Sequence, residues 1–525
     1  MDAEITRSPR WHWPLLILLG LPVFFYGLSS YSVVNGDEGI YHSISVAMLE
    51  TGNWFHLDYY GQHRVYDTFM NAPLHYWGRA VLIALFGDNL WTMRLISAVF
   101  GLLTVLAVYR LAARLDSTGD KRVALFAALI LLTCFQFIYL HSARTGELDT
   151  IVAFLMIAIA ISFLRAVEDK RSFVPHHLFL AALLTVKLPV ALIPVIAELA
   201  LFATSPALRS QFKRYVAFGF AVVPLGLVWH VVQAGDLWDE FLAVMSEMSE
   251  EASGAKGGGN ASGTLLSNFQ FYVRTLIFGF FPWSLAVVPA LFTAIIAIVR
   301  KSKNSETLAL RLSLCFAATV WLFFALVSKR FSWYILPALP FLAISVGWWL
   351  TKLSRGMCWT GALASALIMS FSVWLEASTN GIHPLADRTP RVPMHTVWRS
   401  VDWISVESGF LILLGLLALF FVLANQRWPV QVGRKVGAGL FGVLFLVAAV
   451  RVSVPLASLE QVSELDRFYQ QVEASRLAGK PIAYPLSIPE SMGYLRTKHY
   501  FGRRYRMEMR KGPRGSLILI TGERQ

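Results

Sequence analysis

Apolar runs long enough to cross a membrane recur along most of this 525-residue chain, and they constrain its fold more than any motif does. A helix needs roughly 20 mostly apolar residues to cross a bilayer, and about thirteen runs approach that length. They span 13–34, 91–114, 122–142, 148–165, 176–187, 189–204, 214–233, 276–300, 310–328, 333–351, 357–376, 409–425 and 436–455. A composition of 56% hydrophobic and 15% charged residues also excludes an ordinary soluble enzyme. The pattern predicts an all-α polytopic membrane protein.

Charge in the connecting loops predicts the orientation, because short cytoplasmic loops are enriched in Lys and Arg. Basic residues gather in the loops 114–122, 165–171, 209–214, 300–311, 352–355 and 427–435. All of these fall on one side if the N-terminus is cytoplasmic and every run crosses. The net charge of +13 then follows from topology and gives no reason to expect nucleic-acid binding.

The longest loops fall on the opposite, outer side: 35–90, 234–275, 377–408 and the tail after 455. The loop 35–90 holds two amphipathic stretches, GIYHSISVAMLETGNW and NAPLHYWGRAVLIALFG, suited to helices at the membrane interface. The Gly/Ser-rich composition of EEASGAKGGGNASG indicates a flexible part of the loop 234–275. One helical stretch and two strand-like stretches follow in the tail. We therefore predict a transmembrane catalytic domain over 1–455 and a small extracytoplasmic α/β domain over 456–525.

Ionisable residues at the outer ends of the predicted spans share one level. They are Asp37, Glu38, Arg144, Glu147, Asp149, Lys187, Lys329 and Arg330. Basic groups at that level can hold a lipid phosphate, and acids beside them can activate a hydroxyl. The alternative for each is structural, namely snorkelling to the interface or capping of a helix end, as Asp37-Glu38 could do for the helix that follows. Glu198, deep in the run 189–204, has no role in this scheme.

The succession of motifs carries a resemblance to a known family. GDEGIYHSISVAMLETGNW and NAPLHYWGRAVLIALFGDNLWTMRLISAVFG resemble the start of the GT-C glycosyltransferases, which include bacterial aminoarabinose lipid A transferases and protein O-mannosyltransferases. The similarity continues, in family order, in RTGELDTIVAFLM, LLTVKLPVALIP, FGFFPWSL and SKRFSWYILPALPFLAI. The resemblance implies transfer of a sugar, with inversion, from a polyprenyl-phosphate carrier such as undecaprenyl phosphate. The acceptor would be lipid A or another cell-envelope molecule at the periplasmic face of the bacterial inner membrane.

This chemistry suggests roles for individual residues. Asp37 is the candidate base for an acceptor hydroxyl, and Glu38 positions it or the substrate. If the acceptor is a phosphate, no base is needed, and Asp37 instead orients substrate or binds a metal. The donor phosphate is expected to meet Lys187, Lys329, Arg330, Tyr334 and Arg144. Further substrate contacts are expected from Tyr41, Asn71, His75, Tyr76, Asp149 and Trp283.

The chain departs from the family pattern at one motif. Many relatives have glutamate-lysine-proline-proline-leucine where this chain has Met70-Asn71-Ala72-Pro73-Leu74, so an acid and a phosphate-binding lysine are missing. The histidine that some relatives carry between the seventh and eighth spans is also missing from 234–275. We therefore predict no metal site of the kind found in those relatives; a divalent metal bound by other residues stays open as an alternative, and no other cofactor is expected. The departure also weakens the case for aminoarabinose as the sugar.

Two alternatives remain. One is a protein O-glycosyltransferase of the same fold, and the other is a flippase or transporter of lipid-linked sugar. Transporters tend to place ionisable groups near the membrane midplane, in broken helices, and often contain internal repeats. Here the polar residues concentrate at the outer rim and no half-to-half repeat is visible, which favours the enzyme.

Overall fold

The structure is a computed structural model of the whole chain. It describes all residues except 1–8, 10, 31–35, 60–61, 64–70, 117–120, 140, 254–264, 301–304, 328–329, 354–429, 458–481, 486–506, 512–515 and 522–525. The predicted spans 357–376 and 409–425 and the predicted helix of the tail lie outside the described residues, as does Lys329.

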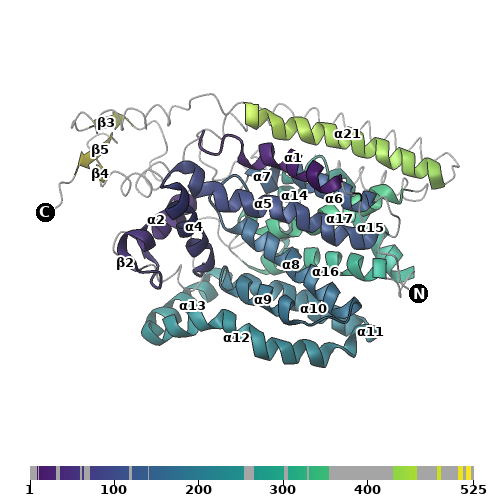
Figure 1. The fold of residues 1–525 in the computed structure, drawn as a ribbon, viewed down its shortest axis with the longest axis horizontal. Coiled ribbons are helices and arrows are strands. Elements are labelled where there is room, and N and C mark those ends of the chain that lie inside the picture. Colours follow the sequence, from purple (N-terminus) through teal and green to yellow (C-terminus); the bar gives the residue numbers. More distant parts are fainter. Residues whose placement is uncertain are drawn as a thin grey trace.

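Helices dominate the described part of the chain (Figure 1). The α-helices are α1 (His12–Phe25), α2 (Gly36–Thr51), α4 (Leu74–Phe86), α5 (Leu90–Ala112), α6 (Arg122–Leu132), α7 (Phe135–Tyr139), α8 (Asp149–Glu168), α9 (Val174–Leu184), α10 (Leu192–Thr204), α11 (Pro206–Arg209), α12 (Phe212–Asp236), α13 (Trp238–Ser253), α14 (Leu265–Gly279), α15 (Ser284–Arg300), α16 (Ser305–Leu326), α17 (Leu339–Thr351) and α21 (Val430–Ala457). Three 3-10 helices join them: η1 (Ala113–Leu115), η2 (Leu188–Ala191) and η3 (Ser332–Ala338).

Strands are few and short. In the first loop, β1 (Asp58–Tyr59) pairs antiparallel with β2 (Gln62–His63). In the tail, β3 (Ile482–Pro485), β4 (Met507–Lys511) and β5 (Ser516–Thr521) form an antiparallel sheet in the order β3-β5-β4. The register of this sheet pairs Ala483 with Ile518 and Met509 with Leu519.

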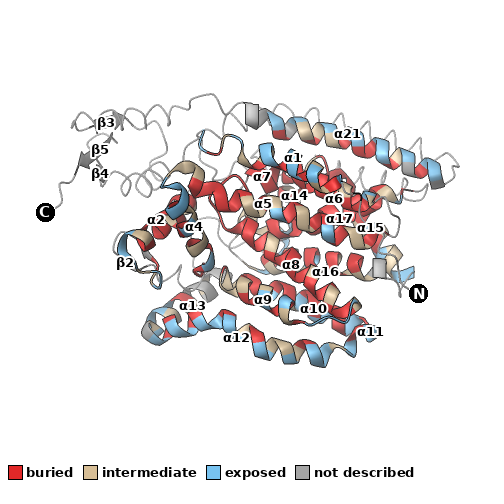
Figure 2. Ribbon diagram, in the orientation of Figure 1, coloured by how far each residue is buried: buried red, intermediate tan, exposed pale blue. Residues whose placement is uncertain are grey.

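Several helices have the length and composition of membrane spans. Within the described ranges six qualify by themselves, and the count reaches seven if the bent pair α14 and α15 is one span. Shorter apolar helices, such as α6 and α9, accompany them. On the outer helices α12 and α21, large apolar side chains such as Phe220 and Leu446 are exposed, as expected for faces that meet lipid (Figure 2). The chain is a multi-pass, mostly helical membrane protein.

Two predicted spans are interrupted, so predicting each as one helix was wrong. The run 276–300 is broken between α14 and α15, whose axes differ by 116°. Pro282 lies in the break, and proline has no N–H to continue a helix. The run 122–142 breaks after Leu132, where the Thr133 hydroxyl bonds back to the carbonyl of Leu129 at 2.8 Å. Hydropathy misses both breaks because apolar residues continue through them.

The buried core lies where α5, α6, α8 and α17 meet, the red centre of Figure 2. Close approach of helices requires small residues there: a Cβ added at Gly347 of α17 would lie 2.8 Å from the backbone nitrogen of Ala127 on α6. Beside this core, α2 and α4 pack on each other and α4 packs on α5 (Figure 1). Both amphipathic stretches predicted in the first loop are therefore helices, and they cover the segment 141–148 that connects α7 to α8.

Candidate functional site

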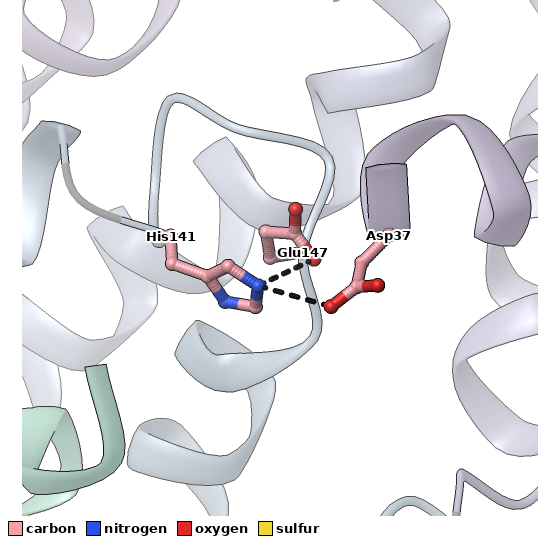
Figure 3. Close-up of side chains that lie close together, drawn as sticks. All are labelled: Asp37, His141 and Glu147. Atoms are coloured by element: carbon pink, nitrogen blue, oxygen red, sulfur yellow. Dashed lines mark hydrogen bonds and ion pairs between the residues drawn. The ribbon is translucent and has the colours of Figure 1, made fainter. Parts of the chain in front are cut away.

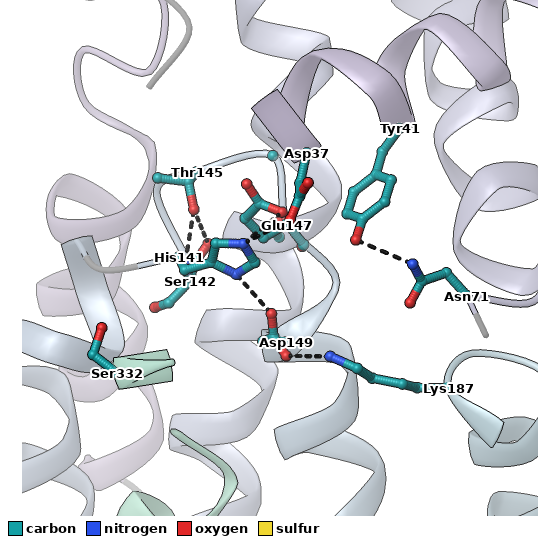
Figure 4. A network of polar contacts seen from close by, with 12 residues as sticks. Asp37, Tyr41, Asn71, His141, Ser142, Thr145, Glu147, Asp149, Lys187 and Ser332 are labelled. Carbon is teal, nitrogen blue, oxygen red and sulfur yellow. Dashed lines mark hydrogen bonds and ion pairs between the residues drawn. The ribbon is translucent and has the colours of Figure 1, made fainter. Parts of the chain in front are cut away.

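A group of polar side chains gathers where the start of α2 meets the segment 141–148 (Figure 4). The first turn of α2 contributes Asp37, and the segment contributes His141 and Glu147. Asp149 begins α8, and Lys187 lies between α9 and η2. These elements come from distant parts of the sequence, so the group exists only because the helices pack.

Glu38 holds the start of α2 against α5 and the segment 141–148 through buried contacts. Its carboxylate is fully buried and pairs with Arg94 of α5, with 2.6 Å between Oε1 and Nε. The same oxygen accepts a hydrogen bond from the backbone N–H of Gly146 at 3.0 Å. The backbones approach so closely that a Cβ at Gly146 would lie 2.8 Å from Cγ of Glu38. These contacts favour a positioning role for Glu38, which joins α2, α5 and the segment 141–148.

His141 links three carboxylates. Its Nδ1 lies 2.8 Å from Oδ2 of Asp149, the distance of a strong hydrogen bond. Its Nε2 lies 3.4 Å from Oδ2 of Asp37 and 3.3 Å from Oε2 of Glu147 (Figure 3). The imidazole also stacks on the Trp333 ring, with 4.2 Å between centroids and 5° between planes. No role was predicted for His141, although it stands only a few residues before the RTGELD motif.

Lys187 completes the group. Its Nζ donates to Oδ1 of Asp149 at 3.1 Å, while 19% of its side chain stays exposed. The result is a continuous set of contacts that we name the polar chain, made of Asp37, His141, Asp149 and Lys187. Three of these residues were predicted as site residues from the sequence, and the structure brings those three together.

The neighbours of each group set its charge. Partial burial raises the pKa of Asp37, although half of its side chain is exposed. The hydrogen bond from His141 and the positive charges of His141 and Lys187 outweigh this effect, so that the pKa of Asp37 is lowered. Burial would lower the pKa of His141, but Glu147, Asp149 and Asp37 together raise it to about 10. Burial and the negative charges of Asp37 and Glu38 raise the pKa of Glu147 to about 8, while the positive charge of His141 limits the increase. Asp37 is therefore ionised at neutral pH, while Glu147 holds a proton.

Aromatic and amide groups border the polar chain. Asn71 Nδ2 donates to the Tyr41 hydroxyl at 3.3 Å, and in Figure 4 Tyr41 appears next to Asp37 with Asn71 beyond it. The Tyr41 ring contacts His75 and Tyr76, with centroids 5.2 and 5.7 Å away. On the other side, Nζ of Lys187 lies 5.8 Å from the centroid of the Tyr334 ring.

Three other predicted residues are used elsewhere in the fold. Arg144 is buried and donates to the carbonyls of Val23 at 2.8 Å and Tyr26 at 2.6 Å, which ties the segment 141–148 to the end of α1. Trp283 is fully buried and donates to the Thr133 hydroxyl at 3.1 Å. We therefore assign Arg144 and Trp283 to packing. Arg330 contacts the Ser267 hydroxyl and the Phe271 ring, and among the described residues no hydrogen bond or ion pair joins it to the polar chain.

One subset has the donor atoms of a metal site. Asp37, His141 and Glu147, which we name the ligand triad, each offer one atom, and the three atoms lie within 4.8 Å of one another. These residues differ from the family positions on which the sequence argument against a metal rested.

Several known proteins with similar sequences are named as glycosyltransferases. Residues 70–232 match the family model of dolichyl-phosphate-mannose-protein mannosyltransferases. Undecaprenyl phosphate-alpha-4-amino-4-deoxy-L-arabinose arabinosyl transferase 1 of Proteus mirabilis is 24% identical over 67% of this chain. The corresponding transferase of Erwinia tasmaniensis is 29% identical over 59% of it. The alignments cover 61% and 54% of these two relatives, less than two thirds of their own lengths.

Solved structures share the fold. ArnT from Cupriavidus metallidurans bound to undecaprenyl phosphate superposes with a TM-score of 0.63 and 20% identity, over 94% of this chain and 85% of that one. The apo state of the same protein gives a TM-score of 0.57 with 19% identity, over 97% of each chain. The chain therefore has the fold of these ArnT structures, and its sequence is similar to those of undecaprenyl-phosphate aminoarabinose transferases and of the dolichyl-phosphate-mannose-protein mannosyltransferase family.

Proposed function

We propose that the chain moves a sugar, with inversion, from a polyprenyl-phosphate carrier of the undecaprenyl type to lipid A or another cell-envelope acceptor. The observation that carries the proposal is the polar chain, which joins a half-exposed carboxylate, Asp37, to a partly exposed ammonium, Lys187. Relatives named for transfer from undecaprenyl phosphate support the donor class.

Lys187 is the proposed partner of the donor phosphate. When the bond to the sugar breaks, negative charge grows on the departing lipid phosphate, and a nearby ammonium lowers the energy of that state. The site is partly dehydrated, because Asp149 beneath Lys187 is buried and Tyr334 lies beside it. Arg330 and Lys329 are proposed to add positive charge further along the phosphate path.

Asp37 is proposed to face the acceptor. Inversion requires the acceptor to approach the sugar from the side opposite the leaving phosphate, and Asp37 and Lys187 occupy opposite ends of the polar chain. An ionised Asp37 can take the proton of an acceptor hydroxyl if it lies within about 2.6–3.2 Å of it. If the acceptor is a phosphate, Asp37 orients substrate or holds a metal. Tyr41, Asn71, His75 and Tyr76 are proposed to line the acceptor side.

The placement in the cell is part of the proposal. We place the N-terminus in the cytoplasm, and the site and C-terminus at the periplasmic face of the inner membrane, with about thirteen spans. We also propose a catalytic domain over 1–455 and a small α/β domain over 456–525. The end of α21 at Ala457 and the sheet of β3, β4 and β5 support that boundary.

Mass spectrometry of envelope glycolipids and glycoproteins tests the function. A deletion strain should lose one sugar-sized mass, which wild type restores and Asp37→Asn does not. Asp239→Asn is the matched control, because Asp239 is an exposed acid on α13, and it should restore the mass fully. Full rescue by Asp37→Asn would contradict the assignment of Asp37. Transfer by purified protein in detergent, where no membrane separates donor from acceptor, distinguishes a transferase from a flippase.

A further inference from the structure

The ligand triad has an arrangement that a hydrogen-bonded network alone does not explain. Nε2 of His141 faces two carboxylate oxygens at once, at 3.3 Å from Glu147 and 3.4 Å from Asp37 (Figure 3). A single N–H shared between two acceptors makes at best a bifurcated hydrogen bond with each of them. Charge-assisted bonds between such groups are also shorter, about 2.7–2.9 Å.

The same spacing suits a metal ion. Zinc bonds to histidine nitrogen and carboxylate oxygen at about 2.0–2.2 Å, so tetrahedral ligand atoms stand roughly 3.3–3.6 Å apart. The two distances from Nε2 of His141 match that separation. A donor set with an imidazole and two carboxylates suits Zn²⁺ or Mn²⁺ better than Ca²⁺ or Mg²⁺, which prefer oxygen alone.

Glu147 gives a second, independent observation. Its side chain is fully buried, yet neither oxygen accepts a hydrogen bond from any described residue. Buried polar atoms in folded proteins nearly always have a partner. Arg79 adds positive charge nearby, but its Nη2 donates to the carbonyl of Gly146 at 2.6 Å. A buried carboxylate that faces Nε2 of His141 and lacks a hydrogen-bond donor among the described residues has oxygen lone pairs that a metal ion can accept.

The surroundings of His141 fit a ligand role as well. Metal-binding histidines almost always donate their other ring N–H to a carboxylate or carbonyl, which fixes the tautomer. Nδ1 of His141 meets Asp149 in this way at 2.8 Å, and Lys187 holds the other oxygen of Asp149. The stack on Trp333 fixes the plane of the ring, so that Nε2 points at the two acids.

We propose that Asp37, His141 and Glu147 bind one divalent transition-metal ion, Zn²⁺ or Mn²⁺, with an open position on the exposed side of Asp37. Binding of the ion displaces the protons of Glu147 and His141, and the resulting two carboxylates and neutral imidazole match the charge of a dication. The open position takes water or a substrate oxygen, which places the ion beside the sugar-transfer site. The role of the ion rests on the proposed function, whereas its binding does not.

The chain contains its own matched control. His176 and Glu198 form another fully buried pair, with 3.3 Å between Nε2 and Oε2, next to the Tyr215 hydroxyl. The described residues place no second carboxylate in a ligand cluster there. Glu198→Gln therefore removes a buried acid beside a histidine without touching the ligand triad.

Metal counting tests the proposal. Full-length protein is loaded with Zn²⁺ or Mn²⁺ separately in detergent, desalted without chelator and measured by inductively coupled plasma mass spectrometry. Wild type and Glu198→Gln should retain about one ion per chain. Glu147→Gln should weaken binding by at least about tenfold, because an amide replaces a charged ligand. Zinc-edge X-ray absorption on wild type needs no variant and should show one imidazole and oxygen ligands at about 2.0–2.2 Å.

Retention well below one ion by wild type, equal retention by Glu147→Gln and wild type, or absorption spectra without imidazole would each overturn the site. Activity separates this proposal from the proposed function. Undiminished sugar transfer by metal-free protein would overturn the role of the ion and leave the proposed function standing. A metal-loaded protein that transfers no sugar would overturn the proposed function and leave the metal site standing.

Discussion

Removal of the Glu38 carboxylate should destabilise the fold strongly. Glu38 and Arg94 both have side chains with no exposed surface, so Glu38→Ala leaves the Arg94 charge buried without its carboxylate. Breaking one side of such a pair costs about 3–5 kcal/mol. The Gly146 N–H also loses its acceptor, which adds at least about 1 kcal/mol. We expect a total near 4–6 kcal/mol from these two effects.

Unfolding of purified protein in mixed micelles, with SDS as the denaturant, measures this change. Glu50→Ala is the control, because Glu50 lies on the same helix with an exposed side chain, and its effect should stay within about 0.5 kcal/mol. Combining Glu38→Ala with Arg94→Leu removes the uncompensated charge. The double variant should therefore lose clearly less stability than the sum of the two single variants.

Additive losses in this cycle would refute the reasoning, because they would mean that Glu38 and Arg94 do not stabilise each other. Glu38→Gln provides a second check on the role of this residue. If the Glu38→Gln variant kept wild-type stability but transferred no sugar, the carboxylate would act in the chemistry, contrary to the buried pairing.

Three further predictions concern the site. Lys187→Met should weaken binding of a polyprenyl phosphate by roughly 10–100-fold in a fluorescence titration, because one charge-assisted contact is lost; unchanged affinity would exclude a phosphate role. Gly146→Ala should lower the free energy of unfolding by about 1–3 kcal/mol, since the added Cβ would lie 2.8 Å from Cγ of Glu38 and 3.0 Å from the Met93 carbonyl oxygen. An unchanged free energy of unfolding would show that the segment 141–148 can shift. In the presence of chelator, the free energy of unfolding should fall as the pH rises from about 7 to 9. The folded chain keeps protons on Glu147, whose pKa is raised to about 8, and on His141, whose pKa is raised to about 10, whereas the unfolded chain has released them. Glu147→Gln should flatten that slope in melting curves.

The sequence predicted the two helices of the first loop, α2 and α4, because apolar spacing is a local property of the chain. The sequence analysis named Asp37 as the candidate base and Glu38 as the positioning residue, but no local property of the sequence separates the two adjacent acids. Successive residues on a helix point about 100° apart, so one of the two faces the core and the other faces solvent. Only the packing of α2 on α5 decides which.

For Arg144 and His141, the role of the side chain depends on tertiary neighbours and could not be predicted from the sequence. Arg144 was predicted as a phosphate ligand from its charge, but its guanidinium donates hydrogen bonds to the carbonyls of Val23 and Tyr26 near the end of α1. His141 carried no signal of its own among 12 histidines. Its importance depends on carboxylates that reach it from α2 and α8, and such tertiary neighbours are not visible in one sequence.

The pairing of Glu38 with Arg94 also has a consequence for biogenesis. The two residues are 56 positions apart, so at about 5–20 residues per second Glu38 leaves the ribosome roughly 3–11 s before its partner. During that interval Arg94 is not yet available, so docking of α2 against the other helices would bury the Glu38 carboxylate without its cationic partner. We therefore expect nascent α2 to remain undocked until α5 has been synthesised and can supply Arg94. Chains arrested before Arg94 should expose this helix to proteases, and longer chains should protect it.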